Sequence, residues 1–154
     1  MARTAFVLVF AAAIGSGIVA GIFYAFSSFV MAALGRLPPE QGAAAMNHIN
    51  VTVITPSFML MFMGTALLCL GVAVVAWRAG AGSLLAGAAC YLLGPLGVTM
   101  AFNVPLNDRL AATAAQDAAS AWPAYVTAWL RWNHVRTAIG TVGIAALGWG
   151  LAAA

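Results

Sequence analysis

Four stretches of this sequence carry almost no charged residue over a length that suffices to cross a lipid bilayer. Residues 5–34, 51–77 and 83–102 contain no charge, and residues 135–154 contain only Arg136. A helix needs about 20 mostly apolar residues to cross the hydrocarbon core. The stretches lack the strict polar and apolar alternation of membrane β-strands, and backbone groups in lipid must be satisfied within the protein. They therefore predict four membrane-spanning helices.

The composition excludes the other broad classes of protein. The chain has 154 residues, of which 64% are hydrophobic and only 6% are charged. This is too little charge for a soluble domain or a disordered chain. The net charge of +3 is scattered along the chain, so we expect no nucleic-acid partner. The expected partner is the lipid bilayer.

The predicted fold is all-α, an integral membrane four-helix bundle with a short extramembrane helical segment between the third and fourth spans. We expect one membrane domain over residues 1–154, with spans at about 5–34, 51–77, 83–104 and 133–153. The apolar run that begins at Ala5 continues to Leu34, beyond a signal-peptide core, so the first span is predicted to be uncleaved. An even number of spans places both termini on one side of the membrane.

Glycines and prolines predict where the helices pack and where they end. Gly17 and Gly21 form a GxxxG pair in the first span, and Gly140 with Gly143 has similar character in the fourth. Pro105 is expected to end the third span, because the residue before a proline is biased away from helical geometry. The Pro38–Pro39 pair can start a short helix through residues 40–49.

The strong polar residues gather at one end of the predicted bundle. Seven of the nine charged residues lie there with both histidines and all five asparagines, while Arg3 and Arg78 mark the other end. The set comprises Asn47, His48, Asn50, Asn103, Asn107, Asp108, Arg109, Arg131, Asn133, His134 and Arg136, among others. The distribution of arginines leaves the membrane orientation open.

One face of the last helix carries several of these residues. Trp129, Trp132, Asn133, Arg136 and Gly140 follow the i, i+3, i+4, i+7 spacing of a single helix face. The glycine on this face predicts that Asn133 and Arg136 face the other helices. Polar groups at membrane depth often mark a functional interior. Two alternatives stay open, because the tryptophans also fit an interfacial belt and the asparagines could be structural.

Two motifs in this polar region resemble a known family. Phe102-Asn-Val-Pro-Leu-Asn-Asp-Arg-Leu110 resembles the Asn-x-Pro-x-Asn signature of the anthrone-oxygenase-like family, and Trp129-Leu-Arg-Trp-Asn-His-Val-Arg-Thr137 resembles its Trp-x-x-Trp-Asn-x-x-Arg signature. Residues 21–27 and 46–50 resemble two weaker segments, in the same order. The resemblance implies a small four-helix membrane protein. It also implies oxidation of an anthrone to an anthraquinone by molecular oxygen, without flavin, haem or metal.

These observations lead to a hypothesis of a membrane oxygenase or related redox enzyme acting on a lipophilic anthrone- or quinol-like aromatic. His134 or His48 is the expected base, since histidine exchanges protons near neutral pH. Arg136, Asn103, Asn107 and Asn133 complete the expected catalytic set, in which arginine and amide groups hold the developing enolate oxygen. The expected substrate-binding residues are Phe23, Tyr24, Phe26, Asn50, Trp129 and Trp132. The aromatic members of that set can stack on the rings of the substrate.

No resident cofactor is predicted, and molecular oxygen would be the co-substrate. A metal at His48 and His134 stays open, although their spacing matches no metal-binding motif. The alternative is a non-enzymatic membrane protein that binds a lipid or small molecule, or an accessory subunit, because no complete catalytic motif occurs. A homodimer also stays open. Arginine without lysine and abundant alanine favour a bacterial cytoplasmic membrane as the location.

Overall fold

The structure of the protein is a computed structural model that describes residues 2–114 and 116–153. Among these residues the regular structure is helical and no strand occurs. The elements are α1 (Arg3–Ala25), η1 (Phe26–Val30), α2 (Met31–Leu34), α3 (Pro39–Thr52), α4 (Pro56–Ala79), α5 (Gly82–Tyr91), η2 (Leu92–Asn103), α6 (Val104–Ala112) and α7 (Ala118–Ala152), where η denotes a π-helix. This confirms the all-α fold.

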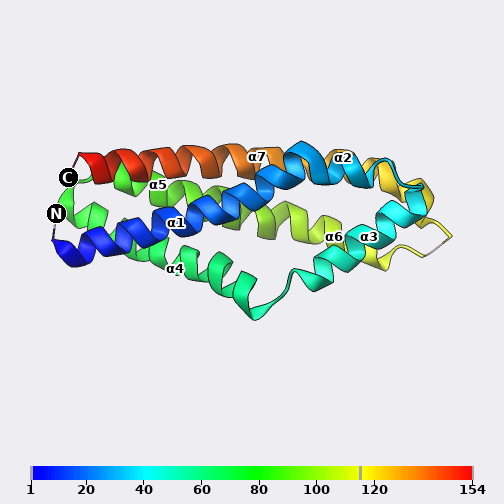
Figure 1. Cartoon of the computed structure of the whole chain (residues 1–154), viewed down its shortest axis with the longest axis horizontal. Coiled ribbons are helices and arrows are strands. Elements are labelled where there is room, and N and C mark those ends of the chain that lie inside the picture. Colours follow the sequence, from blue (N-terminus) through cyan, green and yellow to red (C-terminus); the bar gives the residue numbers. More distant parts are fainter. Residues whose placement is uncertain (1, 115, 154) are drawn as a thin grey trace.

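Four helical stretches are long and apolar enough to cross a membrane, as predicted. They are Arg3–Leu34, Pro56–Ala79, Gly82–Ala112 and Ala118–Ala152. Helix α1 packs against α4 and α7, and α5 packs against the same two helices, which gives a four-helix arrangement. The two termini lie at the same end of the molecule (Figure 1). The chain thus has the architecture expected of an integral membrane bundle.

The second span begins later than the sequence analysis placed it. Residues 53–55 are not part of an α-helix, and α4 starts at Pro56 instead of near residue 51. Thr55 is extended because it precedes a proline, and its hydroxyl accepts the backbone N–H of Phe58 at 3.2 Å. Helix α4 ends at Gly80, whose φ of 65° is the left-handed conformation that glycine adopts without strain.

The helix that contains the third span does not end at Pro105. That expectation was wrong, because the helix continues through Pro105 to Ala112. Pro105 falls in the first turn of α6, at the transition from η2, where a missing N–H and a fixed φ are compatible with a helix. The segment between the third and fourth spans is helical as expected, but its helices are extensions of the two spans. Helix α6 continues η2, and α7 already starts at Ala118, while residues 113, 114, 116 and 117 between them are not helical.

The glycine prediction holds for α7 and fails for α1. A Cβ at Gly140 would lie 3.1 Å from Pro95, and one at Gly143 would lie 2.9 Å from Cys90. A Cβ at Gly17 or Gly21 would meet no atom within 4 Å. Helix α1 instead turns its adjacent face inward, including the buried Gly15, Ser16, Val19, Ala20 and Phe23.

Two hydrophobic cores follow one another along the molecule. The first lies among the four spans and contains Val19, Phe62, Cys69, Tyr91 and Leu147. The second contains Met31, Met46, Leu110, Trp122 and Tyr125. It belongs to the cap, our name for residues 31–52, 104–112 and 118–132. The predicted helix after Pro38–Pro39 is confirmed as α3 and forms one side of this cap.

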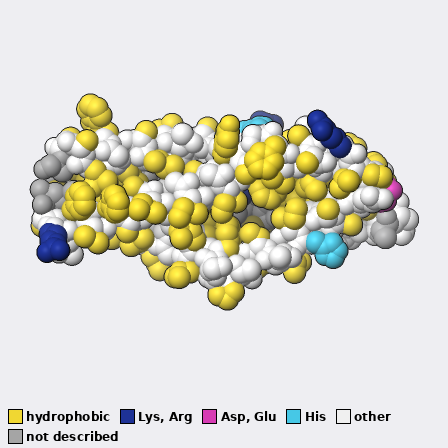
Figure 2. Space-filling model, in the orientation of Figure 1, with side chains coloured by type: hydrophobic (Ala, Val, Ile, Leu, Met, Phe, Trp, Pro, Cys, Tyr) yellow, Lys and Arg dark blue, Asp and Glu magenta, His cyan; other side chains and the backbone are white. Residues whose placement is uncertain are grey.

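Helix lengths predict that the cap lies beyond one end of the bilayer. Helix α4 has 24 residues and is therefore about 36 Å long, close to the hydrocarbon thickness of about 30 Å. Helix α7 has 35 residues and is about 52 Å long, so it extends well past α4. The broad face seen in Figure 2 is mostly covered by hydrophobic side chains, with the charged ones near its borders. We therefore expect the junction between bundle and cap to lie near a membrane boundary.

Candidate functional site

A cavity of about 540 Å³ lies at this junction. It receives residues from α1, η1, α3, the link between α3 and α4, α4, η2, α6 and α7. The hydrophobic lining consists of Ile22, Phe23, Phe26, Met46, Ile49, Val51, Val53, Ile54, Phe58, Met59, Phe62, Met100, Val104, Ala111 and Trp129. The polar lining consists of Asn47, Asn50, Thr99, Asn107, Asp108 and Arg136. Its volume is in the range usual for small-molecule sites.

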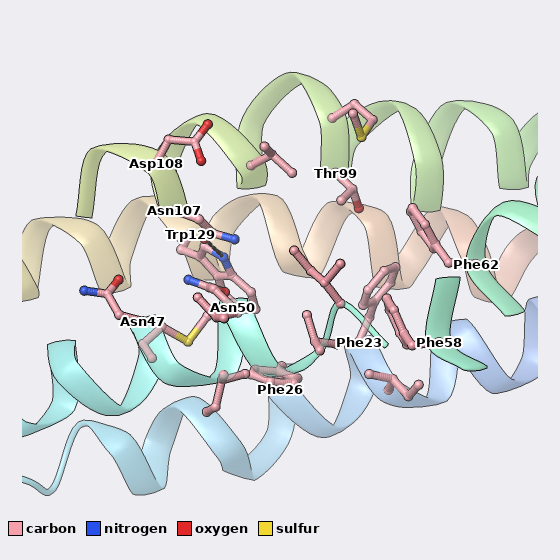
Figure 3. A pocket seen from close by; sticks show the side chains of 18 of the residues that line it. Phe23, Phe26, Asn47, Asn50, Phe58, Phe62, Thr99, Asn107, Asp108 and Trp129 are labelled. Atoms are coloured by element: carbon pink, nitrogen blue, oxygen red, sulfur yellow. Dashed lines mark hydrogen bonds between the residues drawn. The ribbon is translucent and has the colours of Figure 1, made fainter. Parts of the chain in front are cut away.

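Four of the six polar lining side chains lie apart from the aromatic side chains of α4, whereas Thr99 and Arg136 lie close to Phe23. Figure 3 shows Asn47, Asn50, Asn107 and Asp108 toward one end, on α3 and α6. Phe58 and Phe62 of α4 lie toward the other end, with Phe23 of α1. Asn47, Asn50, Asn107 and Asp108 therefore belong to the cap, whereas the bundle supplies the aromatic end together with Thr99 and Arg136. This arrangement suits an amphipathic ligand with a flat apolar body and one polar edge.

Arg136 is the cation of the cavity, and its neighbours are neutral. Its side chain is only 5% exposed. The guanidinium donates from Nε and Nη2 to Asn133 Oδ1 at 2.9 and 2.7 Å, and from Nη1 to Thr99 Oγ1 at 2.8 Å. It also lies over the ring of Phe23, 3.7 Å from the centroid, and 5.0 Å from the centroid of Trp129. These contacts occupy three of its five N–H groups, so two remain for a ligand.

Asn133 and Thr99 hold the guanidinium in place. Asn133 donates to the carbonyl of Phe23 at 2.8 Å and to Ser27 Oγ at 2.7 Å, which ties α7 to α1 and η1. Thr99 donates its own hydroxyl hydrogen to the carbonyl of Pro95 within η2, leaving its lone pairs for Arg136. Each π-helix thus supplies one hydroxyl to this network. π-helical turns are frequent at functional sites because they reposition side chains.

Asn107 is oriented by two donors. Its Oδ1 accepts the hydroxyl of Tyr125 at 2.8 Å and the indole N–H of Trp129 at 2.9 Å. The indole N–H can only donate, so the Asn107 atom that it contacts must be the amide oxygen and not the amide nitrogen. The Nδ2 group of Asn107 is then the free end of a residue that lines the cavity. It adds hydrogen-bond donors to those of Arg136.

Other buried polar atoms near the cavity lack partners among the described residues. They are Asn50 Nδ2 and Asn47 Oδ1, on residues that line the cavity, and Asn103 Oδ1, on a residue that does not. Asn103 donates to the carbonyl of Trp129 at 3.2 Å and so supports that residue from behind. Buried polar atoms usually have partners, so Asn47 and Asn50 indicate a place where a polar ligand or water binds.

The structure brings together half of the residues that the sequence predicted for the site. Residues of this set that line the cavity are Phe23, Phe26, Asn50, Asn107, Trp129 and Arg136. Asn103 and Asn133 lie directly behind Trp129 and Arg136 and contact them. The prediction that Asn133 and Arg136 face the other helices is confirmed, since both are buried.

Four predicted site residues lie elsewhere. His48 and His134 are exposed and are not part of the lining. His134 Nδ1 lies 3.0 Å from Ser27 Oγ, at the outer edge of the Asn133 network. Tyr24 points away from the core with 64% exposure, and Trp132 stacks on Phe102 with centroids 3.6 Å apart. Within residues 2–114 and 116–153, no three His, Cys, Asp or Glu side chains are grouped to hold a metal ion.

Sequence reasoning did not select Thr99, Asp108 or the aromatic pair Phe58 and Phe62. Thr99 lies four residues before Asn103, and Phe58 four before Phe62, so helical spacing was the available signal. Asp108 was noted among the polar residues of this end but received no role. Its contribution depends on α6 continuing as a helix past Pro105, which the sequence analysis did not expect.

Comparison with known proteins identifies the family of the chain. A family model described as anthrone oxygenase matches residues 52–146, which is well over half of the chain and includes the helices that carry Thr99, Asn107, Asn133 and Arg136. No curated protein and no solved structure matches the chain significantly. The extent of the family match shows that this chain belongs to the anthrone oxygenase family.

Proposed function

We propose that this protein is a membrane oxygenase that uses molecular oxygen to oxidise a lipophilic, anthrone- or quinol-like aromatic, without a resident cofactor. The observation that carries the proposal is the amphipathic cavity at the membrane boundary, where aromatic walls meet convergent hydrogen-bond donors. A hydrophobic substrate dissolved in the bilayer would be concentrated at this depth. The composition favours the bacterial cytoplasmic membrane as the location.

In the proposed reaction the substrate carries a CH₂ group made acidic by a conjugated carbonyl. One C–H bond breaks, the proton goes to a base, and the electron pair delocalises onto the carbonyl oxygen. The carbon then bonds to O₂, giving a peroxide that takes up a proton. Loss of the second hydrogen as a proton, with cleavage of the O–O bond, leaves a new carbonyl and releases water. One oxygen atom enters the product and the other becomes water.

The hydrogen-bond donors that line the cavity match the charge that develops in this reaction. Arg136 offers two N–H groups and Asn107 offers its Nδ2, so both can donate to the enolate oxygen. Asn50 Nδ2 is a third donor. Phe23, Phe26 and Trp129 present apolar surface for the rings. Asn133 and Thr99 act as positioning residues, because both hold Arg136 by hydrogen bonds. Thr99 also lines the cavity, whereas Asn133 does not.

Quinone formation by purified full-length protein in detergent tests the proposal. Wild-type protein should convert anthrone in air-saturated buffer faster than the protein-free solution does. Arg136→Gln should lower kcat by roughly 10²- to 10³-fold, the usual cost of removing a donor to a developing oxyanion. Arg131→Gln is the matched control, because Arg131 lies on the same helix but is exposed and outside the cavity.

Two results would contradict the proposal. One is a wild-type rate equal to the protein-free rate, and the other is an Arg136→Gln rate equal to the wild-type rate. If anthrone or anthraquinone bound in the cavity without turnover, the protein would be the non-enzymatic alternative, a membrane protein that binds a lipophilic small molecule. Quenching of tryptophan fluorescence, compared with a Trp129→Phe variant, measures that binding.

A further inference from the structure

Asp108 is the acidic residue that lines the cavity. The chain contains three acidic residues, Glu40, Asp108 and Asp117, and neither of the other two contributes to the lining. Asp108 lies on α6 directly after Asn107, and Figure 3 shows it at the same end of the cavity as Asn47 and Asn50, which lie across from it on α3. It is exposed, and within residues 2–114 and 116–153 no hydrogen bond occupies its carboxylate. Its oxygens are therefore free to accept a proton.

Asp108 and Arg136 share the cavity without neutralising each other. The hydrogen-bond partners of Arg136 are Asn133 and Thr99, and none is a carboxylate. An acid and a cation with no other role would be expected to pair when they border one small cavity. Here a negative acceptor and a positive donor instead remain available at separate places. That separation is what a reaction needs when a proton leaves one atom of a substrate while charge builds on another.

We infer that Asp108 is the base that removes the proton from the acidic carbon of the substrate. The inference rests on the proposed function and assigns the step that Arg136 and Asn107 cannot perform, since both present only donors. The C–H bond breaks, the proton moves to a carboxylate oxygen of Asp108, and the electron pair moves to the substrate oxygen near Arg136. Aspartate serves as a general base at carbon in enzymes that hold the enolate oxygen with hydrogen-bond donors.

The positions of the histidines favour the same assignment. A general base must come within hydrogen-bond reach of the proton that it takes, directly or through one water. His48 and His134 do not line the cavity, and His134 is engaged with Ser27 at the outer edge of the network. Asp108 does line the cavity, where a bound substrate can contact it. The base role suggested by the sequence for the two histidines stays a prediction that the same experiment tests.

Hydrogen exchange under anaerobic conditions isolates this step. Anthrone is incubated in D₂O buffer with the full-length protein in detergent, and deuterium uptake at the CH₂ carbon is followed by mass spectrometry. Because no oxygen is present, the exchange reports proton removal alone. We expect Asp108→Asn to lower the protein-dependent exchange rate roughly 10²- to 10⁴-fold. The control is Asp117→Asn, which changes an exposed aspartate outside the cavity. Its exchange rate should stay within about twofold of the wild-type rate, because no general base is removed.

Chemical rescue separates a base from a structural residue. In Asp108→Ala, added formate should restore part of the exchange, because a small carboxylate can occupy the vacated position, and chloride at equal ionic strength should not. Melting curves and anthraquinone binding of each variant show whether the cavity is intact. Loss of exchange accompanied by loss of anthraquinone binding and without formate rescue would overturn the assignment in favour of a structural role.

The remaining outcomes distinguish this inference from the proposed function. If Asp108→Asn exchanges and forms quinone at the wild-type rate, the inference fails and the oxygenase stands. If exchange instead disappears in His48→Gln or His134→Gln while Asp108→Asn keeps it, the base is a histidine. If wild-type protein exchanges in an Asp108-dependent way but forms no quinone in air, the inference stands and the oxygenase fails. Absence of both activities in wild type overturns both.

Discussion

Arg136 shows how a single buried residue organises the site. A charged side chain with 5% exposure must be held by hydrogen bonds, and here the partners are an amide and a hydroxyl instead of a carboxylate. The positive charge is therefore still available to a ligand. The helical spacing of Trp129, Asn133 and Arg136 predicted the inward direction of this side chain. It did not predict Thr99, which lies 37 positions away in the sequence and reaches Arg136 only through the packing of η2 against α7.

Thr99→Val tests this holding role. Valine keeps the shape of threonine but cannot accept the Nη1 hydrogen, so a buried charged donor loses its partner. We expect the protein to lose about 1–3 kcal/mol of stability, seen as a lower apparent melting temperature in detergent. Thr127→Val is the control, because Thr127 is exposed on α7 and bonds only to the carbonyl of Pro123. Equal melting temperatures for the two variants would mean that Thr99 does not hold the guanidinium.

At the scale of helices, the contact between α5 and α7 depends on small residues. A Cβ at Gly87 would lie 2.9 Å from the backbone oxygen of Gly143, and one at Gly143 would lie 3.1 Å from that of Gly87. The two backbones therefore approach too closely for any side chain at either position. The GxxxG pair of α1 is also made of small residues but has no such contact. Spacing alone cannot separate the two cases, because the face that a helix turns inward depends on the other helices.

Alanine substitutions should distinguish these two glycine pairs. Gly143→Ala forces α5 and α7 apart and should cost about 1–3 kcal/mol. In Gly21→Ala the added methyl group meets open space, and the substitution only reduces the backbone freedom of the unfolded chain. Its effect on the free energy of unfolding should therefore be neutral or slightly stabilising. Thermal denaturation of both variants in the same detergent measures the difference. A destabilising Gly21→Ala in the monomer would contradict the helix orientation described for α1.

Over the whole molecule, the site lies where the membrane bundle meets the cap. The bundle contributes Phe23, Phe58 and Phe62, and the cap contributes Asn47 and Asn107. Neither part forms the cavity alone, because the bundle and the cap each supply lining residues. The length of α4 places the boundary between them near Pro56. The α3–α4 link, with Ile54 68% exposed, borders the cavity at this depth.

The depth of the link can be measured with spin labels in lipid vesicles. A label at Ile54→Cys should lie near the headgroups and be relaxed mainly by a water-soluble nickel complex. A label at Leu67→Cys, which is 70% exposed near the middle of α4, should lie in the hydrocarbon and be relaxed mainly by oxygen. A variant without Cys69 and Cys90 supplies the background. If both labels reported the same depth, the cavity would not lie at a membrane boundary.

Much of the fold could be predicted from composition and periodicity. Runs of about 20 uncharged apolar residues leave few structures other than membrane helices, since lipid offers no hydrogen-bond partners to the backbone. The clustering of Asn, His and Arg at one end and the inward face of Asn133 and Arg136 also followed from position and spacing. Helix ends were less predictable. Pro105 lies within a continuous helix, whereas Pro56 follows a non-helical link that ends at Thr55. Both are possible, because proline is compatible with the first turn of a helix and also disfavours helical geometry in the residue before it.

The sequence by itself determined the class of fold, the family resemblance and the end of the molecule at which the site lies. These depend on local properties, namely apolar length, helical spacing and the order of motifs. Only the tertiary structure decided which polar residues share a cavity. It placed Asp108 and Thr99 in the lining and both histidines outside it, because η2 and α6 form one continuous helix and α3 packs across it. Rotation of a helix about its axis is set by its neighbours, and that rotation determines which side chains a substrate can meet.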